Sequence, residues 1–167
     1  MLIRRTQTAD LDAVMGIYAR ARDYMAEQGN PHQWGDIGWP PREVIEQDIA
    51  AGKSYVCEHE GRLAAVFYYD RGHRVDPCYD RIEGAWVGDE DYGVVHRIAA
   101  AASGTGAGRA AIAWAIEQSA GHLRMDTHED NAPMRGLLES MGFIHCGTIY
   151  VREDPEPRRA YEHIGSA

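Results

Sequence analysis

Hydrophobic residues recur along the chain at two spacings, which predict its helices and strands. A spacing of three and four residues predicts a helix that Thr8 caps and that ends near Gly29, followed by a short helix beginning at Pro41. One face of the short helix carries Val44, Ile45, Asp48 and Ile49. The connection between the two helices holds Trp34 and Trp39 among glycine and proline, and we expect it to be irregular.

Alternating, β-branched and aromatic residues predict the strands. Residues 2–5 predict a first strand, and residues 54–70 predict a β-hairpin that turns at Glu60 and Gly61. A weaker signal indicates a strand near residues 82–87. The remaining predicted strands span residues 92–101, 122–127, 143–151 and 158–164.

A glycine-rich loop joins the strand at 92–101 to a predicted helix at 109–119. The first backbone N–H groups of a helix have no partner within the helix and carry partial positive charge, so they attract phosphate. Glycine lets a phosphate approach without obstruction by a Cβ. The same pattern also fits a tight turn that binds no ligand. The residues in question are Gly104, Thr105, Gly106, Gly108 and Arg109.

Two common phosphate-binding motifs do not fit this loop. A Walker A loop requires a lysine, which the loop lacks, and this disfavours a P-loop nucleotidase. A dinucleotide-binding fingerprint requires a different spacing of its third glycine and a position in the first βα unit. Only 59 residues follow Gly108, too few for the rest of such a sheet. A dinucleotide-binding protein is therefore a disfavoured rival.

The length of 167 residues predicts a single domain that spans residues 1–167. The longest apolar run has seven residues, from 63 to 69, whereas a membrane-spanning helix needs roughly 20. The first residues lack the apolar stretch of a secretory signal, so we expect a cytoplasmic protein without membrane partners.

The charge and the cysteines exclude further classes. Seventeen basic against 26 acidic residues give a net charge of −9, which disfavours nucleic acid as a partner. Cys57, Cys78 and Cys146 are widely spaced and form no CxxC motif, so we expect reduced thiols rather than a disulfide framework or zinc site. Asp126, His128 and Asp130 form a DxHxD run that could suggest a metal site. We expect these residues to end a strand and cap a helix instead, and we predict no metal.

Two segments together resemble the GCN5-related N-acetyltransferase (GNAT) family. The segment HRIAAAASGTGAGRAAIAWAIEQ resembles its acyl-CoA-binding motif, with Gly106 and Gly108 at the two glycine positions and Ser103 where arginine or glutamine is usual. A second family motif is an asparagine followed by a helix that ends in Gly-Phe. Its spacing is matched by Asn131, Met134, Leu138, Gly142 and Phe143.

The resemblance covers essentially the whole chain and implies an α+β fold of the GNAT type. It implies a mixed central sheet of about six or seven strands flanked by about four helices, and acetyl-CoA as co-substrate. The phosphates would lie on the backbone of the glycine loop, and the pantetheine arm would pair with the preceding strand. The implied cofactor-binding residues are Ile98, Ala99, Ala100, Gly104, Thr105, Gly106, Ala107, Gly108, Arg109 and Asn131.

The general acid departs from the family pattern. A tyrosine usually protonates the leaving thiolate, but here its position holds Leu138. Tyr150 and Cys146 are candidate substitutes, and strand alternation would place them on one face. Each also fits an ordinary structural role, Tyr150 at the surface and Cys146 as an inert core thiol.

The candidate general base is His96, because an imidazole titrates near neutral pH. Strand alternation predicts that His96 and Arg97 point to opposite faces, and some family members carry a glutamate at the position of Val94. A satisfied sheet histidine is the alternative interpretation. Glu83 is a second candidate base.

The resemblance also places Trp34 and Trp39 in a region that shapes the acceptor site. Their rings could hold the acceptor by stacking or cation–π contact, or could simply cover a small core.

The sequence thus predicts an N-acetyltransferase that moves an acetyl group to a primary amine of a small molecule or peptide by direct attack. The alternative is a non-catalytic acyl-CoA-binding or sensing module of the same fold. The acceptor and the oligomeric state stay open, and a homodimer is one option.

Overall fold

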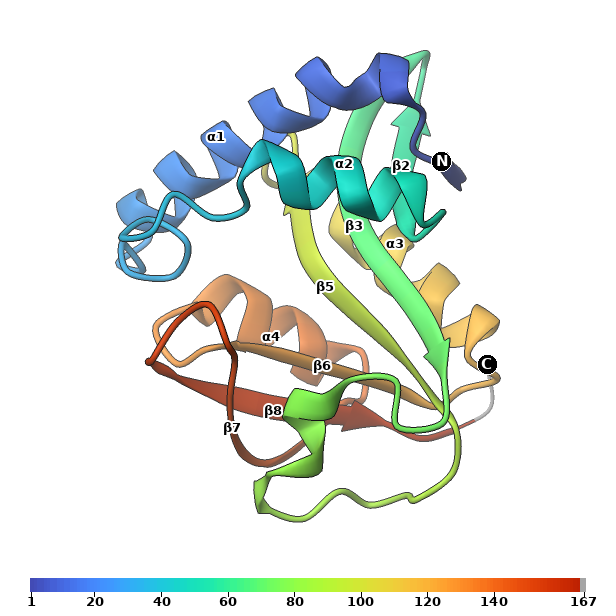
Figure 1. Cartoon of the computed structure of the whole chain (residues 1–167), viewed down its shortest axis with the longest axis vertical. Coiled ribbons are helices and arrows are strands. Elements are labelled where there is room, and N and C mark those ends of the chain that lie inside the picture. The colour runs from blue at the N-terminus through green and yellow to red at the C-terminus, as the bar shows by residue number, and fades with distance from the viewer. Residues whose placement is uncertain (166–167) are drawn as a thin grey trace. The chain divides into compact units, whose positions relative to one another are not determined.

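The computed structural model describes residues 1–165, and among these it contains four α-helices and eight strands (Figure 1). The helices are α1 (Leu11–Glu27), α2 (Arg42–Ala50), α3 (Ala107–Gln118) and α4 (Ala132–Ser140). The strands are β1 (Leu2–Arg5), β2 (Ser54–His59), β3 (Arg62–Gly72), β4 (Glu83–Gly84), β5 (Tyr92–Ala100), β6 (Leu123–His128), β7 (Ile144–Tyr150) and β8 (Pro157–His163).

The strands form one mixed sheet in the order β1-β2-β3-β5-β6-β8-β7-β4. The α+β class predicted from the sequence is confirmed. The sheet has eight strands rather than about six or seven, and one of them, β4, is only two residues long. By their internal contacts the described residues divide into two compact units. The first consists of residues 1–69 with 96–114, and the second of residues 70–95 with those from 115 onward.

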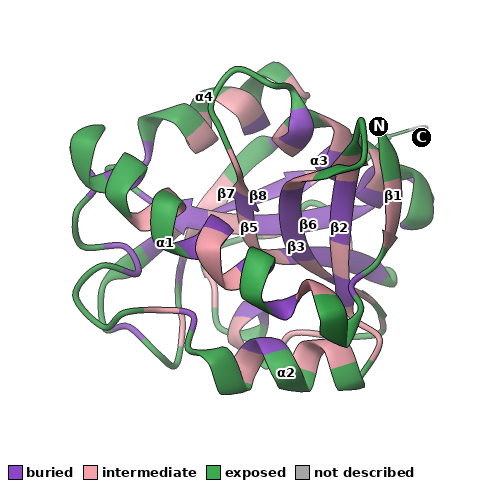
Figure 2. Ribbon diagram, turned by 90° about the horizontal axis from the view of Figure 1, so that it is seen from above, coloured by how far each residue is buried: buried purple, intermediate pink, exposed green. Residues whose placement is uncertain are grey.

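In the first unit, α1 and α2 cover one face of the β2–β3 hairpin. The hairpin turns at Glu60 and Gly61, whose φ angles of 51° and 72° are those of a tight two-residue turn. Figure 2 colours buried residues purple, and in this unit they include stretches of α1, β2 and β3. The buried core residues are Leu11, Val14, Ile17, Tyr18, Met25, Trp34, Ile45, Val56, Val66 and Ala99.

The opposite face of the hairpin carries aromatic side chains. Trp114 on α3 packs its ring 4.8 Å from that of Tyr55 and 5.7 Å from that of Phe67. Cys57, on the same face, is fully buried, and burial raises its pKa to about 11. This thiol therefore stays protonated at neutral pH.

The start of the first helix differs from the sequence prediction. A short 3₁₀ turn, Thr8–Asp10, precedes α1, and the Asp10 carboxylate accepts a hydrogen bond of 2.8 Å from the backbone N–H of Gln7. The prediction that Thr8 caps the helix is wrong, because helical geometry already begins at Thr8.

In the second unit, β6, β8 and β7 pair antiparallel, and β5 starts parallel to β6 at Gly93 and Val94. At the edge of this unit β4 pairs with β7, and two glycines face each other there. A Cβ on Gly84 would lie 2.2 Å from the carbonyl oxygen of Cys146, and one on Gly147 would lie 2.1 Å from that of Glu83. This pairing therefore requires glycine at both positions.

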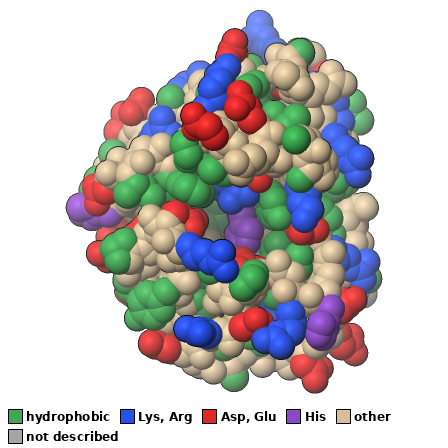
Figure 3. All heavy atoms as spheres, in the orientation of Figure 1, with side chains coloured by type: hydrophobic (Ala, Val, Ile, Leu, Met, Phe, Trp, Pro, Cys, Tyr) green, Lys and Arg blue, Asp and Glu red, His purple; other side chains and the backbone are tan. Residues whose placement is uncertain are grey.

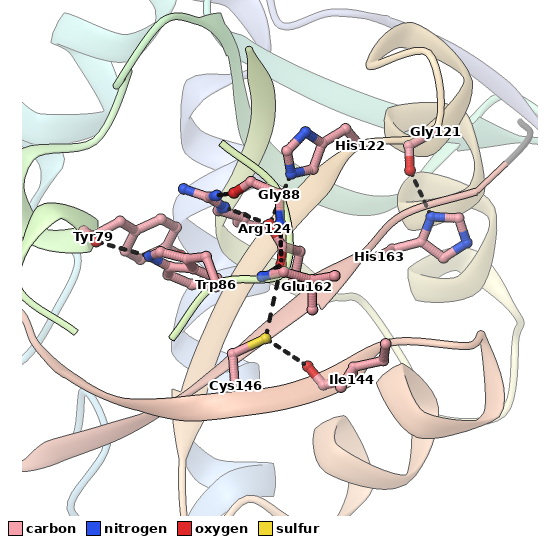
Figure 4. Close-up of polar contacts among 11 residues, drawn as sticks. Tyr79, Trp86, Gly88, Gly121, His122, Arg124, Ile144, Cys146, Glu162 and His163 are labelled. Carbon is pink, nitrogen blue, oxygen red and sulfur yellow. Dashed lines mark hydrogen bonds and ion pairs between the residues drawn. The ribbon is translucent and has the colours of Figure 1, made fainter. Parts of the chain in front are cut away.

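A fully buried carboxylate, Glu162 on β8, fastens the loop around residues 85–89 to the sheet (Figure 4). It accepts hydrogen bonds from His122 and Arg124 at 2.8 and 2.9 Å, and from the backbone of Val87 and Gly88. The Arg124 guanidinium also lies 4.3 Å from the ring of Trp86. Burial alone raises the pKa of Glu162, but these donors hold it below its ordinary value.

On the surface, acidic and basic side chains are interspersed on the face that Figure 3 shows. Within residues 1–165, no helix combines the length and the apolar character needed to cross a membrane. Over the same residues, no group of three histidine, cysteine or acidic side chains lies where it could hold a metal ion.

Candidate functional site

The glycine loop of the first unit leads directly into α3. Gly104 and Gly106 adopt φ angles of +73° and +76°, which favour glycine because a Cβ disfavours this region. The carbonyl of Gly106 accepts the hydrogen bond from Ala110 N–H at 3.0 Å and so begins the helix. The sequence-predicted loop is thus a turn that leads into a twelve-residue helix, whose first N–H groups have no partner within the helix.

The outer side of this loop is open. A Cβ built on Gly104 or Gly106 would meet no heavy atom within 4 Å, and residues 102–106 are exposed. The Thr105 hydroxyl lies in the turn, where it donates to the Ala102 carbonyl at 3.3 Å and accepts from Ala107 N–H at 3.4 Å. Arg109 is exposed in the first helical turn. A helix start with an accessible glycine turn and a nearby cation has the chemistry of a phosphate site.

The strand before the loop carries the residues expected to meet the pantetheine arm. Ala99 is 5% exposed and belongs to the core of the first unit, whereas Ile98 and Ala100 are half-buried. After them, Ala101 N–H donates to the Ala64 carbonyl at 2.9 Å. These residues and the glycine loop therefore lie in one unit, in direct succession.

His96 and Arg97 do not alternate as a regular strand predicts. Arg97 has a φ angle of +51°, and its guanidinium lies 4.6 Å above the Tyr68 ring. The His96 ring lies 5.8 Å from the same Tyr68 ring. Both side chains thus contact one residue, and the prediction that they point to opposite faces is wrong because the backbone of Arg97 is left-handed.

The two tryptophans of the connection between α1 and α2 differ in exposure. Trp34 is 8% exposed, and its ring packs edge-on against Tyr18 with centroids 5.8 Å apart. Trp39 is half-buried against the same core, and its carbonyl accepts a hydrogen bond from Arg22 at 3.1 Å. Trp34 therefore covers the core of the first unit, and Trp39 presents the more accessible ring.

Asn131 and Leu138 lie in the second unit, at the start of α4 and within it. The Asn131 side chain caps the helix, because its oxygen accepts a hydrogen bond from Met134 N–H at 3.2 Å. Leu138, at the position where the family's tyrosine is usual, is fully buried. A buried aliphatic side chain cannot donate a proton.

Tyr150 and Cys146 do not share a face of β7. Tyr150 pairs with Pro157, whereas the Cys146 sulfur lies 3.9 Å from Oε2 of Glu162, five residues along β8 and so on the other face. The alternation prediction fails because the register shifts between His145 and Gly147. Burial, followed by the charge of Glu162, raises the pKa of Cys146, while Tyr150 is 48% exposed at the strand end.

Glu83, the second candidate base, is exposed on β4 at the edge of the second unit. The predicted site residues are thus divided. His96, the two tryptophans and the glycine loop belong to the first unit, and Glu83, Asn131, Cys146 and Tyr150 belong to the second.

The acidic segment after β6 has structural contacts. Asp126 accepts a hydrogen bond of 2.7 Å from the Tyr79 hydroxyl, and His128 Nδ1 accepts one of 3.1 Å from Asp130 N–H. Burial, and then the charge of Asp126, raises the pKa of Tyr79, so its hydroxyl remains a donor. These contacts fit the strand-end role expected from the sequence.

Three residues near His96 were not identified as site residues from the sequence. Tyr18 donates a hydrogen bond of 2.7 Å to the Arg97 carbonyl, and Asp48 forms two hydrogen bonds with the Arg97 guanidinium. Tyr68 lies beneath both β5 side chains. The available signal was Asp48 itself, a carboxylate on the apolar face of its helix.

Comparison with known proteins identifies the family and the fold. A family model described as the acetyltransferase (GNAT) family matches residues 17–143. The crystal structure of a GNAT-family acetyltransferase from Streptococcus agalactiae is 31% identical, with a TM-score of 0.81, and the match covers 99% of this chain and 96% of that one. No curated protein sequence matches the chain.

Two further structures share the fold at lower identity. The ribosomal-protein-alanine N-acetyltransferase from Brucella melitensis is 22% identical, with a TM-score of 0.65, over 99% of this chain and all 100% of that one. A GNAT-family acetyltransferase from Listeria monocytogenes is also 22% identical, with a TM-score of 0.65, over 98% and 94% of the two chains. At this identity the likeness concerns the fold alone.

Proposed function

Because the chain belongs to the acetyltransferase (GNAT) family, we propose that it transfers an acetyl group from acetyl-CoA to a primary amine of a small molecule or peptide. The observation that carries the proposal is the glycine loop at the start of α3, whose left-handed glycines leave its outer side open. The diphosphate of the co-substrate binds the N–H groups between Thr105 and Arg109, where the charge of Arg109 and the helix dipole favour an anion.

The transfer proceeds by direct attack of the neutral amine on the thioester carbonyl. The nitrogen forms a bond to the carbonyl carbon, the tetrahedral intermediate collapses, and the carbon–sulfur bond breaks to release the CoA thiolate. His96 accepts the proton that the amine loses, directly or through water. For the proton that the thiolate takes up, the candidate from the sequence stays Tyr150, the exposed last residue of β7.

A loop variant tests the binding step. In Gly106→Ala the Cβ disfavours the φ angle of +76°, and we expect the affinity for CoA to fall about tenfold. The matched control is Gly29→Ala, since Gly29 also has a positive φ angle of +84° and no heavy atom within 4 Å of its Cβ position. Calorimetric titration with CoA and with NAD measures both variants. Wild-type binding of NAD but not CoA would contradict the proposal.

The burial of Leu138 favours a second candidate function, a CoA-binding module without turnover. Incubation with acetyl-CoA and a panel of amines separates the two functions. Release of free thiol that depends on an amine supports the transferase. Binding of CoA without amine-dependent thiol release supports the module.

A further inference from the structure

The kink in β5 at Arg97 needs support from its surroundings. A residue with a Cβ seldom adopts a φ angle of +51°, least of all inside a strand, and such a conformation persists where neighbouring groups hold it in place. Arg97 lies between His96, the candidate base, and the residues that lead to the glycine loop. Whatever holds Arg97 therefore also sets the course of β5 at His96.

Three side chains from three elements hold this residue. From α1, the Tyr18 hydroxyl donates to the Arg97 carbonyl at 2.7 Å. From α2, Asp48 accepts hydrogen bonds from Arg97 Nε and Nη2 at 2.9 and 3.0 Å. From β3, the Tyr68 ring lies beneath the guanidinium. The planar guanidinium bound at two points by a carboxylate is fixed in direction as well as position.

The kink also brings His96 into this group. With Arg97 in the left-handed conformation, both side chains contact the ring of Tyr68. The charges that act on the Asp48 carboxylate are those of Arg97, His96 and Lys53, so Asp48 lies close enough to His96 for their charges to interact.

Asp48 is ionised there at a cost. Its side chain is 12% exposed, and burial raises its pKa despite the opposing charge of Arg97. The negative charge is therefore poorly explained by stability alone. Asp48 binds Arg97, the residue next to His96 in β5, and this position suggests a role in the geometry of the strand.

We infer that Asp48 is a positioning residue of the acetyl transfer: by binding the Arg97 guanidinium at two points, it fixes the bend of β5 and so the direction of the His96 imidazole. This inference rests on the proposed function, in which His96 accepts the proton of the amine. Asp48 acts through Arg97, the residue that its carboxylate contacts.

The test compares Asp48→Asn with wild type. We expect kcat to fall about tenfold or more, since a small displacement of a catalytic group is costly, while KM for acetyl-CoA stays within about twofold. The acid limb of the kcat/KM profile should move to lower pH, because the imidazolium ion loses a neighbouring carboxylate. Asp48→Glu keeps the charge and should retain the wild-type acid limb.

A measurement without turnover accompanies the kinetics. Proton NMR follows the titration of His96, whose signal is identified by its loss in His96→Gln, and its midpoint should move to lower pH in Asp48→Asn. The matched control is Asp12→Asn, which removes the same charge from an exposed ion pair with Arg42 and should leave rate and titration unchanged.

The two proposals fail in different ways. If the wild-type chain acetylates an amine and Asp48→Asn keeps the wild-type kcat and His96 titration, the inference on Asp48 is overturned and the transferase stands. Equal effects of Asp12→Asn and Asp48→Asn would overturn it as well. Absence of amine-dependent turnover in the wild-type chain defeats the transferase proposal itself.

Discussion

Asp48 in the first unit and Glu162 in the second are both buried carboxylates that bind an arginine, yet their pKa values move in opposite directions. Glu162 is fully buried and accepts hydrogen bonds from the side chains of His122, Arg124 and Cys146 and from two backbone N–H groups. The Asp48 carboxylate accepts its hydrogen bonds from the Arg97 guanidinium. The difference indicates that the donors to Glu162 outweigh the effect of its burial on the pKa, whereas the Arg97 guanidinium does not outweigh the effect of burial on Asp48.

The largest effect on stability is expected from neutralising Glu162, the carboxylate with several hydrogen-bond donors. Glu162→Gln leaves the buried cation Arg124 without its counter-charge and should lower the free energy of unfolding by about 3–5 kcal/mol. Urea denaturation at pH 7 measures it. Glu129→Gln, at an exposed ion pair with Arg159, is the control and should change stability by less than about 0.5 kcal/mol. If Glu162→Gln is as stable as this control, Glu162 does not stabilise the fold and the contrast with Asp48 is wrong.

Low pH should remove most of the difference in stability between wild type and Glu162→Gln. A carboxyl group whose folded pKa lies below its unfolded value stabilises the fold fully above the unfolded pKa, here 4.5, and loses this contribution as the pH falls through the folded pKa. We therefore expect the stability gap between wild type and Glu162→Gln to narrow below pH 4.5. Denaturation curves at a series of acidic pH values would show it, and a gap that widens would contradict the assignment.

An intermediate effect is expected at the other support of the β5 bend. Tyr18→Phe removes the hydroxyl that donates to the Arg97 carbonyl and should cost about 1–2 kcal/mol of stability. Burial raises the pKa of Tyr18, so the hydroxyl donates throughout the neutral range. Thermal unfolding measures the loss, with Tyr24→Phe, an exposed tyrosine of the same helix, as the control. Equal melting temperatures would show that the bend does not depend on this bond.

The smallest effect on stability is expected at Asp48. Because its folded pKa is raised, the ionised form favours unfolding, so Asp48→Asn should change stability at pH 7 by less than about 1 kcal/mol. As the pH falls and Asp48 takes up its proton, the balance should move in favour of the wild type. Denaturation curves of wild type and Asp48→Asn at the same acidic pH values test the direction of this change. A loss as large as that of Glu162→Gln would make Asp48 a structural anchor of the same kind.

Much of the fold follows from local pattern. The β2–β3 hairpin turns at Glu60 and Gly61 as predicted, since few residues other than glycine accept such a turn. Asn131 begins α4 and Gly142 follows its end, as capping preferences indicate. The loop before α3 was likewise readable from the spacing of its glycines.

The parts that escaped prediction are those where distant residues override a local rule. Strict alternation fails at Arg97 because Tyr18, Asp48 and Tyr68 stabilise a conformation that the strand alone would avoid. It fails again at Cys146, where β7 gains a residue relative to β8. Neither irregularity has a signature in its own segment, so no periodicity argument could locate it.

The facing glycines of β4 and β7 bear on which substitutions this chain can accept. Gly84 and Gly147 lie at a sheet edge, where exposed positions ordinarily accept almost any residue, yet a methyl group on either would overlap a carbonyl oxygen of the opposite strand. Saturation mutagenesis followed by selection for folded protein should therefore recover a wide choice at neighbouring Glu83 and a single amino acid at these two codons. Two surface sites would then be as intolerant as the interior, for reasons of backbone contact alone.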